Sequence, residues 1–130
     1  MEARRILYKS IFKYEDHNET LTYEERGTLT QDQEQFIIAF KVNNERIEIH
    51  HSDSHVTLKH GPALLAFSLH EPMTSPYPLA HGVVDLTGKV ISLKSREDSL
   101  HFVYELYDHE VLLSTVYLMV RLLPVEEVVA

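Results

Sequence analysis

Three histidines lie within six positions of one short segment, HHSDSH, at residues 50–55. Imidazole nitrogens are frequent ligands of zinc, and they titrate close to neutral pH. The segment is therefore a candidate for a metal site, for a pH-sensitive site, or for the exposed tip of a hairpin. The direction of each side chain decides between these hypotheses, so the local structure has to be predicted first.

A turn at Ser52 and Asp53 places His50 and His55 directly opposite each other on the outer face of a hairpin. Their Cβ atoms are then about 4.5–5.5 Å apart, which allows them to share a zinc ion at Zn–N distances of about 2.0–2.1 Å. Glu48, on the same face, and Asp53 would supply carboxylates. No zinc motif such as HExxH occurs, so the alternative is a solvated histidine-rich hairpin, and no cofactor is predicted.

His51 has the opposite parity and is predicted to face inward, across from Phe36 near the ends of two strands. One interpretation is a half-exposed histidine at the rim of the fold. The other is a polar contact at the mouth of an internal cavity.

A second set of polar residues shares the predicted inner face of the first two and last two strands. These residues are Tyr8, Ser10, Tyr23, Glu25, Tyr104, Thr115 and Tyr117. Apolar cavities with a few converging polar groups are the usual form of small-molecule sites. The four tyrosines and Glu25, with His51 near the mouth, are therefore the predicted contacts of a small apolar or amphipathic ligand. The alternative is that these side chains only fill the interior.

The sequence predicts no catalytic site. There is no GxSxG motif, and the four glycines are isolated, so no phosphate-binding loop is present. Adjacent carboxylates such as Glu24 and Glu25 point to opposite faces of a strand, which excludes paired acid–base chemistry within one site. One enzymatic hypothesis remains, a hydrolase or isomerase that uses an interior Glu25 as its base.

The elements that position these residues are predicted to be strands. Alternation of apolar and polar residues with a period of two is interrupted by turn residues at intervals typical of an all-β sandwich or barrel. The predicted strands are 4–14, 19–29, 34–42, 45–51, 54–60, 63–70, 78–86, 89–95, 99–107 and 110–122. Residues 71–77 form the longer connection. Closure removes exposed edges, so the prediction is a closed antiparallel up-and-down barrel of eight to ten strands over residues 1–123, with a tail at 124–130.

Three short turns define the predicted register. A turn at Asn43-Asn44 pairs Ile38 with Ile49 and Phe36 with His51, the turn at Ser52 pairs Ile49 with Val56, and the turn at Gly61 pairs Val56 with Phe67. One apolar face is then continuous across four strands, as a correct register requires.

Further pairs are predicted in the first and last strands. They are Phe12 with Leu21, Tyr8 with Glu25, Val84 with Ile91 across a turn at Thr87-Gly88, Leu93 with Phe102, Ile91 with Tyr104, and Leu106 with Val111.

The last strand is apolar on both sides, which predicts that both sides are covered. Its predicted outer face carries Leu112, Val116, Leu118, Val120 and Leu122. The tail LPVEEVVA could fold over this face, and so could a second subunit. Patches of this kind commonly mark interfaces, so a homodimer is predicted. The second functional hypothesis follows from it: a structural or interaction protein with a filled barrel that acts through this face.

Composition limits the other partners. The 130 residues are 44% hydrophobic and carry a net charge of −8, which argues against nucleic acid and anionic membranes as ligands of a basic surface. The chain has no cysteine, so disulfides and thiolate chemistry are excluded. The first 16 residues hold no apolar stretch suited to a signal peptide, and the expected location is the cytoplasm.

Three segments contain motifs in a characteristic order: YEERGTLTQDQEQFIIAF, HVTLKHGPALLAFSLHEPMTSPYPLAHGVVDLTGKVISLKS and FVYELYDHEVLLSTVYLMVRL. This order resembles that of the YwiB-like bacterial family of unknown function. The family pattern places an aromatic residue before the glycine at 82, where this chain has His81. The resemblance implies a calycin-like, lipocalin-type barrel, a fold whose members often bind small apolar molecules, and it implies no particular activity.

Overall fold

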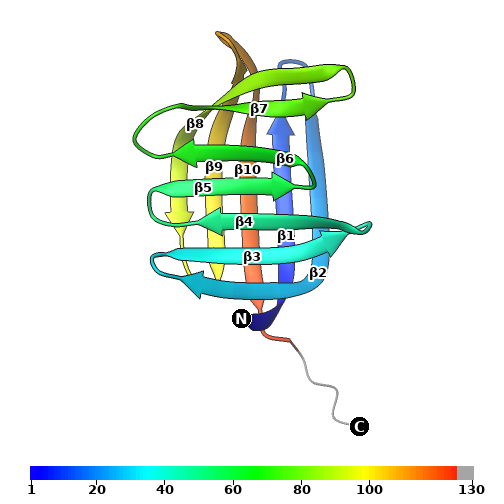
Figure 1. Cartoon of the computed structure of the whole chain (residues 1–130), viewed down its shortest axis with the longest axis vertical. Helices are drawn as coiled ribbons and strands as arrows, with labels where there is room; N and C mark the ends of the chain where they lie inside the picture. Colours follow the sequence, from blue (N-terminus) through cyan, green and yellow to red (C-terminus); the bar gives the residue numbers. More distant parts are fainter. Residues whose placement is uncertain (126–130) are drawn as a thin grey trace.

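A computed structural model of the chain describes residues 1–125, and its regular elements are all β-strands (Figure 1). They are β1 (Glu2–Lys13), β2 (Asn18–Asp32), β3 (Gln35–Val42), β4 (Glu45–His51), β5 (His55–His60), β6 (Ala63–Ser68), β7 (Met73–Leu79), β8 (Gly82–Ser95), β9 (Ser99–Asp108) and β10 (Val111–Leu123). Residues 1–125 contain no helix that could cross a membrane. Most of the predicted tail, residues 126–130, lies outside the described residues.

The strands form one antiparallel sheet with the order β6-β5-β4-β3-β2-β1-β10-β9-β8-β7. The first and last strands pair antiparallel, from Arg5 opposite Leu123 to Lys13 opposite Thr115. The predicted all-β up-and-down barrel is therefore confirmed, although closure is nearly rather than fully complete. β6 and β7 lie side by side without a ladder between them, and the Ala66 amide donates to Ser75 Oγ at 3.3 Å across this seam.

Two long strands turn the corners of the barrel. β2 pairs with β1 over most of its length and with β3 at its end, and β8 pairs first with β7 and then with β9. Strands β3 to β6 consequently cross β1, β9 and β10 at a steep angle, as in an orthogonal packing (Figure 1). Each corner strand carries a glycine where it changes neighbours, Gly27 in β2 and Gly88 in β8.

Both corner glycines are required by close contacts. A Cβ on Gly27 would lie 2.2 Å from the Ala39 carbonyl oxygen, and a Cβ on Gly88 would lie 2.3 Å from a ring carbon of Phe67. Glycine in a strand commonly marks such a bend, because the absent side chain lets the backbone approach its neighbour.

The core fills the space between the two crossing layers. Its fully buried members come from both layers and include Ile6, Ile38, Ile49, Val56, Phe67, Leu100, Phe102, Val116, Leu118 and Val120. Three aromatic rings meet at its centre, with centroids 5.0 Å apart for Phe67 and Phe102 and 4.5 Å apart for Phe67 and Tyr104. The edge-to-face arrangement of the phenylalanines is one that aromatic pairs prefer.

The predicted register is confirmed in the middle of the chain. Ile38 lies opposite Ile49, Phe36 opposite His51, and Val56 opposite Phe67. Leu93 likewise lies opposite Phe102.

Two hairpins differ from the prediction by two residues. Ile49 pairs with Leu58 instead of Val56, because residues 52–54 form a longer loop, and Tyr8 pairs with Tyr23 instead of Glu25. In the same hairpin as Tyr8, Phe12 lies opposite Glu19 and not Leu21. A shift of two residues leaves each side chain on its predicted face.

The segment 71–79 was predicted incorrectly. Met73–Leu79 is strand β7, and β8 runs through Thr87 and Gly88 without a turn, so the predicted pair of Val84 and Ile91 is wrong. Val84 lies opposite Tyr77 instead. Pro76 and Pro78 are tolerated because β7 is a terminal strand of the sheet, where the missing N–H groups are not needed by a second neighbour.

A bulge in β8 displaces one predicted pair, and a second bulge inverts the predicted faces of β10. Register shifts occur between Val90 and Ser92 in β8 and between Leu112 and Ser114 in β10. Ile91 is exposed and Val90 lies opposite Tyr104 instead, while Leu106 pairs with Ser114 and not with Val111. One inserted residue moves all subsequent side chains to the opposite face.

The predicted dimer patch is consequently part of the core. Val116, Leu118, Val120 and Leu122 are buried inside the barrel, and only Leu112 of that set is exposed. The outward positions of β10 are Thr115, Tyr117, Met119 and Arg121, so the residues assigned to an outer interface were wrong.

Candidate functional site

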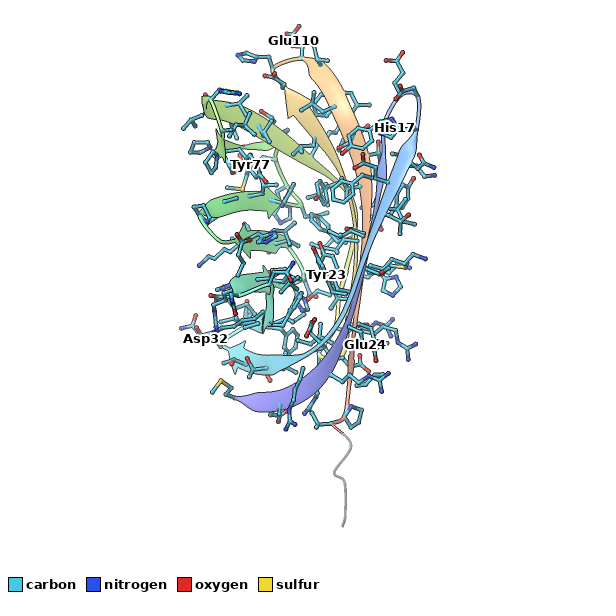
Figure 2. The ribbon with its side chains drawn as sticks, turned by 90° about the vertical axis from the view of Figure 1, so that its right-hand side faces the viewer. His17, Tyr23, Glu24, Asp32, Tyr77 and Glu110 are labelled. Carbon is cyan, nitrogen blue, oxygen red and sulfur yellow. The ribbon has the colours of Figure 1, made fainter. Side chains whose placement is uncertain are left out.

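The barrel interior contains a cavity of about 150 Å³ that is partly open to solvent. It lies between β1 and β2 on one side and β4, β5 and β6 on the other, with Tyr104 of β9 and Tyr77 of β7 completing its wall. Its apolar lining comes from Phe12, Leu21, Ile47, Ile49, Leu58, Ala63 and Leu65. Figure 2 shows Tyr23 directed between the two layers while its neighbour Glu24 lies on the outer side.

Four tyrosines meet at this cavity, three of which the sequence placed together. Tyr8 and Tyr23 are cross-strand partners with ring centroids 5.4 Å apart. Tyr104 reaches the same space from β9. Tyr77 was missed, because its segment was predicted to be a loop, and its strand pairing with β8 gives it an inward position.

The buried phenols remain neutral at physiological pH. Burial raises the pKa of Tyr104 and of Tyr8 above the ordinary value of 10.0. The Ser10 hydroxyl lies near the Tyr8 phenol and offsets part of the increase in the pKa of Tyr8. Ser10 Oγ is buried and forms no hydrogen bond of ordinary length within residues 1–125. The cavity thus contains hydroxyl groups that can donate and accept hydrogen bonds but carry no charge.

Three residues predicted on the inner face, Glu25, Thr115 and Tyr117, do not line the interior. Glu25 is exposed near the corner of β2, beside Arg5 and Arg26, and Tyr117 is on the outer face of β10, where its ring lies 4.8 Å from Lys13 Nζ. The position of Glu25 arises because β2 bends at Gly27, and those of Thr115 and Tyr117 follow from the bulge in β10. Because Glu25 is not in the interior, it cannot be the base of a hydrolase or isomerase site there, and that hypothesis loses its support.

An ion pair borders the open side of the cavity. His60 Nε2 lies 2.6 Å from Glu45 Oε2, next to the turn at Gly61. His60 also lines the cavity, because it lies opposite the inward-facing Ile47. The sequence analysis assigned no role to this pair. The signal that could have identified it is the alternation of side chains at the end of β5 and the start of β4, which places the two residues near each other.

His51 faces inward opposite Phe36, as predicted, but it is fully buried at 1% exposure and does not line the cavity. Its predicted position at the mouth is therefore wrong. Its Nδ1 is 2.6 Å from Ser95 Oγ, and its ring centroid lies 5.4 Å from that of Phe36. Nε2 is buried without a hydrogen-bond partner in the described part of the chain.

Burial lowers the pKa of His51 from 6.5 to about 4. Between these values the unfolded chain binds a proton that the folded protein does not, so the free energy of unfolding falls as the pH falls. We expect a loss of about 3 kcal/mol once the pH reaches 4. Above pH 7 the histidine is neutral in both states and contributes no pH dependence.

Urea unfolding of the wild type and of His51→Asn, at pH values from 7 to 4, measures this effect. Asparagine keeps a polar group near Ser95 and does not titrate, so the variant should lose less stability over this range, whereas the exposed His101→Asn should behave like the wild type. The pKa of Glu48 is lowered from 4.5 to about 2 by bonds from Arg46 and His50, so this residue adds a loss of stability below about pH 4.5 that is common to the wild type and both variants. Equal losses in wild type and His51→Asn would contradict the buried, neutral state of His51.

The predicted opposition of His50 and His55 is wrong. His50 lies opposite Thr57 and its Nε2 is 2.9 Å from Glu48 Oε1, while His55 lies opposite Ser68 and contacts Ser54. The longer loop at residues 52–54 separates the two imidazoles. Within residues 1–125, no three side chains of His, Asp or Glu are grouped so that they could hold a metal ion.

Comparison with known proteins supports the fold. No model of a protein family matches the chain, and no curated protein matches its sequence. Among solved structures, the crystal structure of the ywiB protein from Bacillus subtilis matches with a TM-score of 0.72 and 12% sequence identity, covering 92% of this chain and 90% of that one. The predicted YwiB-like resemblance is confirmed as a shared barrel fold over nearly the whole chain.

Proposed function

We propose that the barrel binds one small, neutral, largely apolar molecule in its interior cavity. The observation that carries this proposal is the convergence of Tyr8, Tyr23, Tyr77 and Tyr104 on a space whose remaining lining is mainly apolar. Such a site offers apolar contact over most of a ligand and hydrogen bonds at a few positions, which is the usual division in small-molecule pockets.

The size of the cavity limits the ligand. Pockets for drug-sized molecules typically enclose about 300–1,000 Å³, and this cavity has about 150 Å³. A cavity of that volume with an apolar lining can hold a molecule about the size of benzene. We therefore propose a single aromatic ring or a short branched alkyl group, and not a fatty acid or a larger metabolite.

The electrostatics of the cavity favour an uncharged ligand. Besides the tyrosines, the ionisable residues along the cavity are Glu48, Lys59 and His60. Glu48 already contacts Arg46, and His60 contacts Glu45. A charged group brought inside would therefore lose its hydration with few free partners to compensate for it. A ligand with one hydroxyl group could instead exchange a hydrogen bond with Tyr23 or Tyr104.

Two alanines on the same strand provide a matched test. Ala63 lines the cavity, whereas Ala66 lies on the opposite face of β6. We expect phenol or toluene at ten times its dissociation constant to raise the melting temperature of the wild type by roughly 5 °C. Ala63→Leu should abolish this increase by filling the cavity, and Ala66→Leu should retain it.

Substitution of a cavity tyrosine separates the hydrogen bond to the ligand from the apolar contact with it. Tyr104→Phe should weaken the stabilisation by phenol and leave that by toluene, because only the hydroxyl partner is removed. The proposal fails if a panel of phenol, toluene, indole and isoamyl alcohol leaves the melting temperature unchanged at saturation. It also fails if Ala63→Leu responds to these compounds as the wild type does.

A further inference from the structure

The charges of this acidic protein are distributed unevenly over its surface. Along the stretches where β8, β9, β10, β1 and β2 pair with one another, the outer face carries seven of the chain's 12 lysine and arginine residues and two of its 20 aspartate and glutamate residues. The basic residues are Arg5, Lys9, Lys13, Arg26, Lys89, Lys94 and Arg121, and the acidic ones are Glu24 and Glu105. The charge of this face cannot be recognised in the sequence, because its residues alternate with core residues along five separate strands.

The two acidic residues offset only part of this charge. Glu24 forms an ion pair with Arg5 at 2.5 Å, and Glu105 lies opposite Lys89 in the neighbouring strand. Lys9, Lys13 and Arg121 are exposed near the centre of the layer, where β1 meets β10. The centre of the face is therefore positively charged.

An apolar groove runs along β10. Lys9, Lys13 and Arg121 border it, together with Glu15 and with Glu24, which pairs with Arg5. Three adjoining hollows of about 410, 240 and 470 Å³ form it, the first two sharing His101 and Met119 and the last two sharing Lys13 and Tyr117. Its floor consists of Leu7, Ile11, Val103, Tyr117 and Met119. We name this surface, floor and basic border together, the β10 groove.

We propose that the β10 groove binds an amphipathic α-helix of a partner protein whose apolar stripe is bordered by aspartate and glutamate. The groove extends from Arg121 to Leu112, a distance of about 30 Å for a strand of that length. A helix of about 20 residues has the same length. Covering an apolar sheet face with a helix is a common solution in protein structures, and the basic border complements acidic flanks.

The shape and chemistry of the groove favour a helix over other anionic partners. Leu7, Ile11 and Tyr117 are partly buried, whereas Lys9 and Lys13 beside them are exposed. A flat membrane would meet the charged border before the recessed apolar floor, whereas a rod can lie within the groove. Single-stranded nucleic acid binds through stacked aromatic rings. The described groove offers Tyr117 on its floor and, at its end, Tyr14, whose ring already stacks on His17.

Fluorescence anisotropy with a designed peptide tests the proposal on the whole 130-residue chain. The probe is a labelled amphipathic peptide of about 20 residues, with leucines along one stripe and glutamates beside them. The matched control peptide has lysine in place of each glutamate. We expect only the acidic peptide to bind, more weakly at higher salt, and circular dichroism to show helix formation in the complex.

Variants of the protein locate the binding surface. Met119→Asp and the double variant Lys9→Glu, Arg121→Glu should each weaken binding by about tenfold or more. Lys41→Glu, the reversal of one charge at an exposed position in β3 of the other layer, should not weaken it. Binding by Ala63→Leu should equal that of the wild type, which separates this proposal from ligand binding in the interior cavity.

Several outcomes would overturn the proposal. The first is the absence of binding by the acidic peptide, and the second is equal binding of the acidic and basic peptides. A third is wild-type binding that survives in Met119→Asp. Tighter binding of phosphatidylserine vesicles or polyuridylate than of the peptide, lost in Met119→Asp, would assign the groove to a membrane or nucleic acid. Self-association that Met119→Asp abolishes would assign it to a second copy of this chain.

Discussion

Replacing Leu118 by glutamate is expected to unfold the protein, whereas the same replacement at the next residue, Met119, leaves it folded. Leu118 is 1% exposed and lies opposite Phe102 in the core. Truncating such a leucine costs about 2–5 kcal/mol, and an unpaired buried carboxylate adds several kcal/mol more. The sum is comparable with the whole stability of a typical domain, about 5–15 kcal/mol.

Met119 is the matched control, because it is 36% exposed on the outer face of the same strand. Far-UV circular dichroism and urea unfolding of Leu118→Glu and Met119→Glu at pH 7 measure the difference. The opposite order of stabilities would place Leu118 outside and would restore the interface that the sequence predicted. If the wild type is a dimer and Leu118→Glu is a folded monomer, Leu118 would likewise lie on the outer face, in the interface that the sequence predicted.

Replacing Gly27 by alanine should destabilise the protein more than a typical surface substitution, by about 3 kcal/mol or more. The added Cβ would lie 2.2 Å from the main-chain oxygen of Ala39 and 2.4 Å from Ile6 Cδ1. Since one of these atoms belongs to the backbone of β3, a rotamer change cannot relieve the contact, and strands β2 and β3 must separate. Urea unfolding measures the loss.

Gly88 provides an informative contrast to Gly27. Its added Cβ would meet three ring carbons of Phe67, the nearest at 2.3 Å, and these belong to a side chain. Phe67→Leu should therefore recover part of the stability lost in Gly88→Ala, and no single side-chain truncation should do so for Gly27→Ala. A neutral Gly27→Ala variant would show that β2 does not approach β3 at this corner.

Much of the fold could be predicted because the alternation of side chains and the chemistry of the turns agree. Asn43 and Asn44 both have the positive φ that their hairpin requires, and the strands they join have the predicted register. Where the loop at residues 52–54 was longer than expected, the register moved by two residues. The predicted inner face was nevertheless correct in this hairpin, because a register shift of two residues keeps every side chain on the same face of the sheet.

The errors concentrate where the sequence supports two arrangements equally well. In β10, Leu112, Leu113, Val116 and Leu118 are apolar at both parities, so the pattern does not distinguish the inner face from the outer one. The bulge at Leu112 then decided the outcome. The prolines of β7 indicated a loop, because no local signal showed that this segment would occupy a terminal position in the sheet, where proline is tolerated.

The sequence by itself determined an all-β antiparallel barrel, the pairing of its first and last strands, and the meeting of Tyr8, Tyr23 and Tyr104 inside it. These features follow from a two-residue periodicity that recurs in strand after strand. Only the tertiary structure decided which face of β10 is buried, where β2 and β8 bend, and that basic residues of β1 and β10 border one groove. Each of those depends on a single inserted residue or on contacts between strands distant in sequence, which local patterns do not encode.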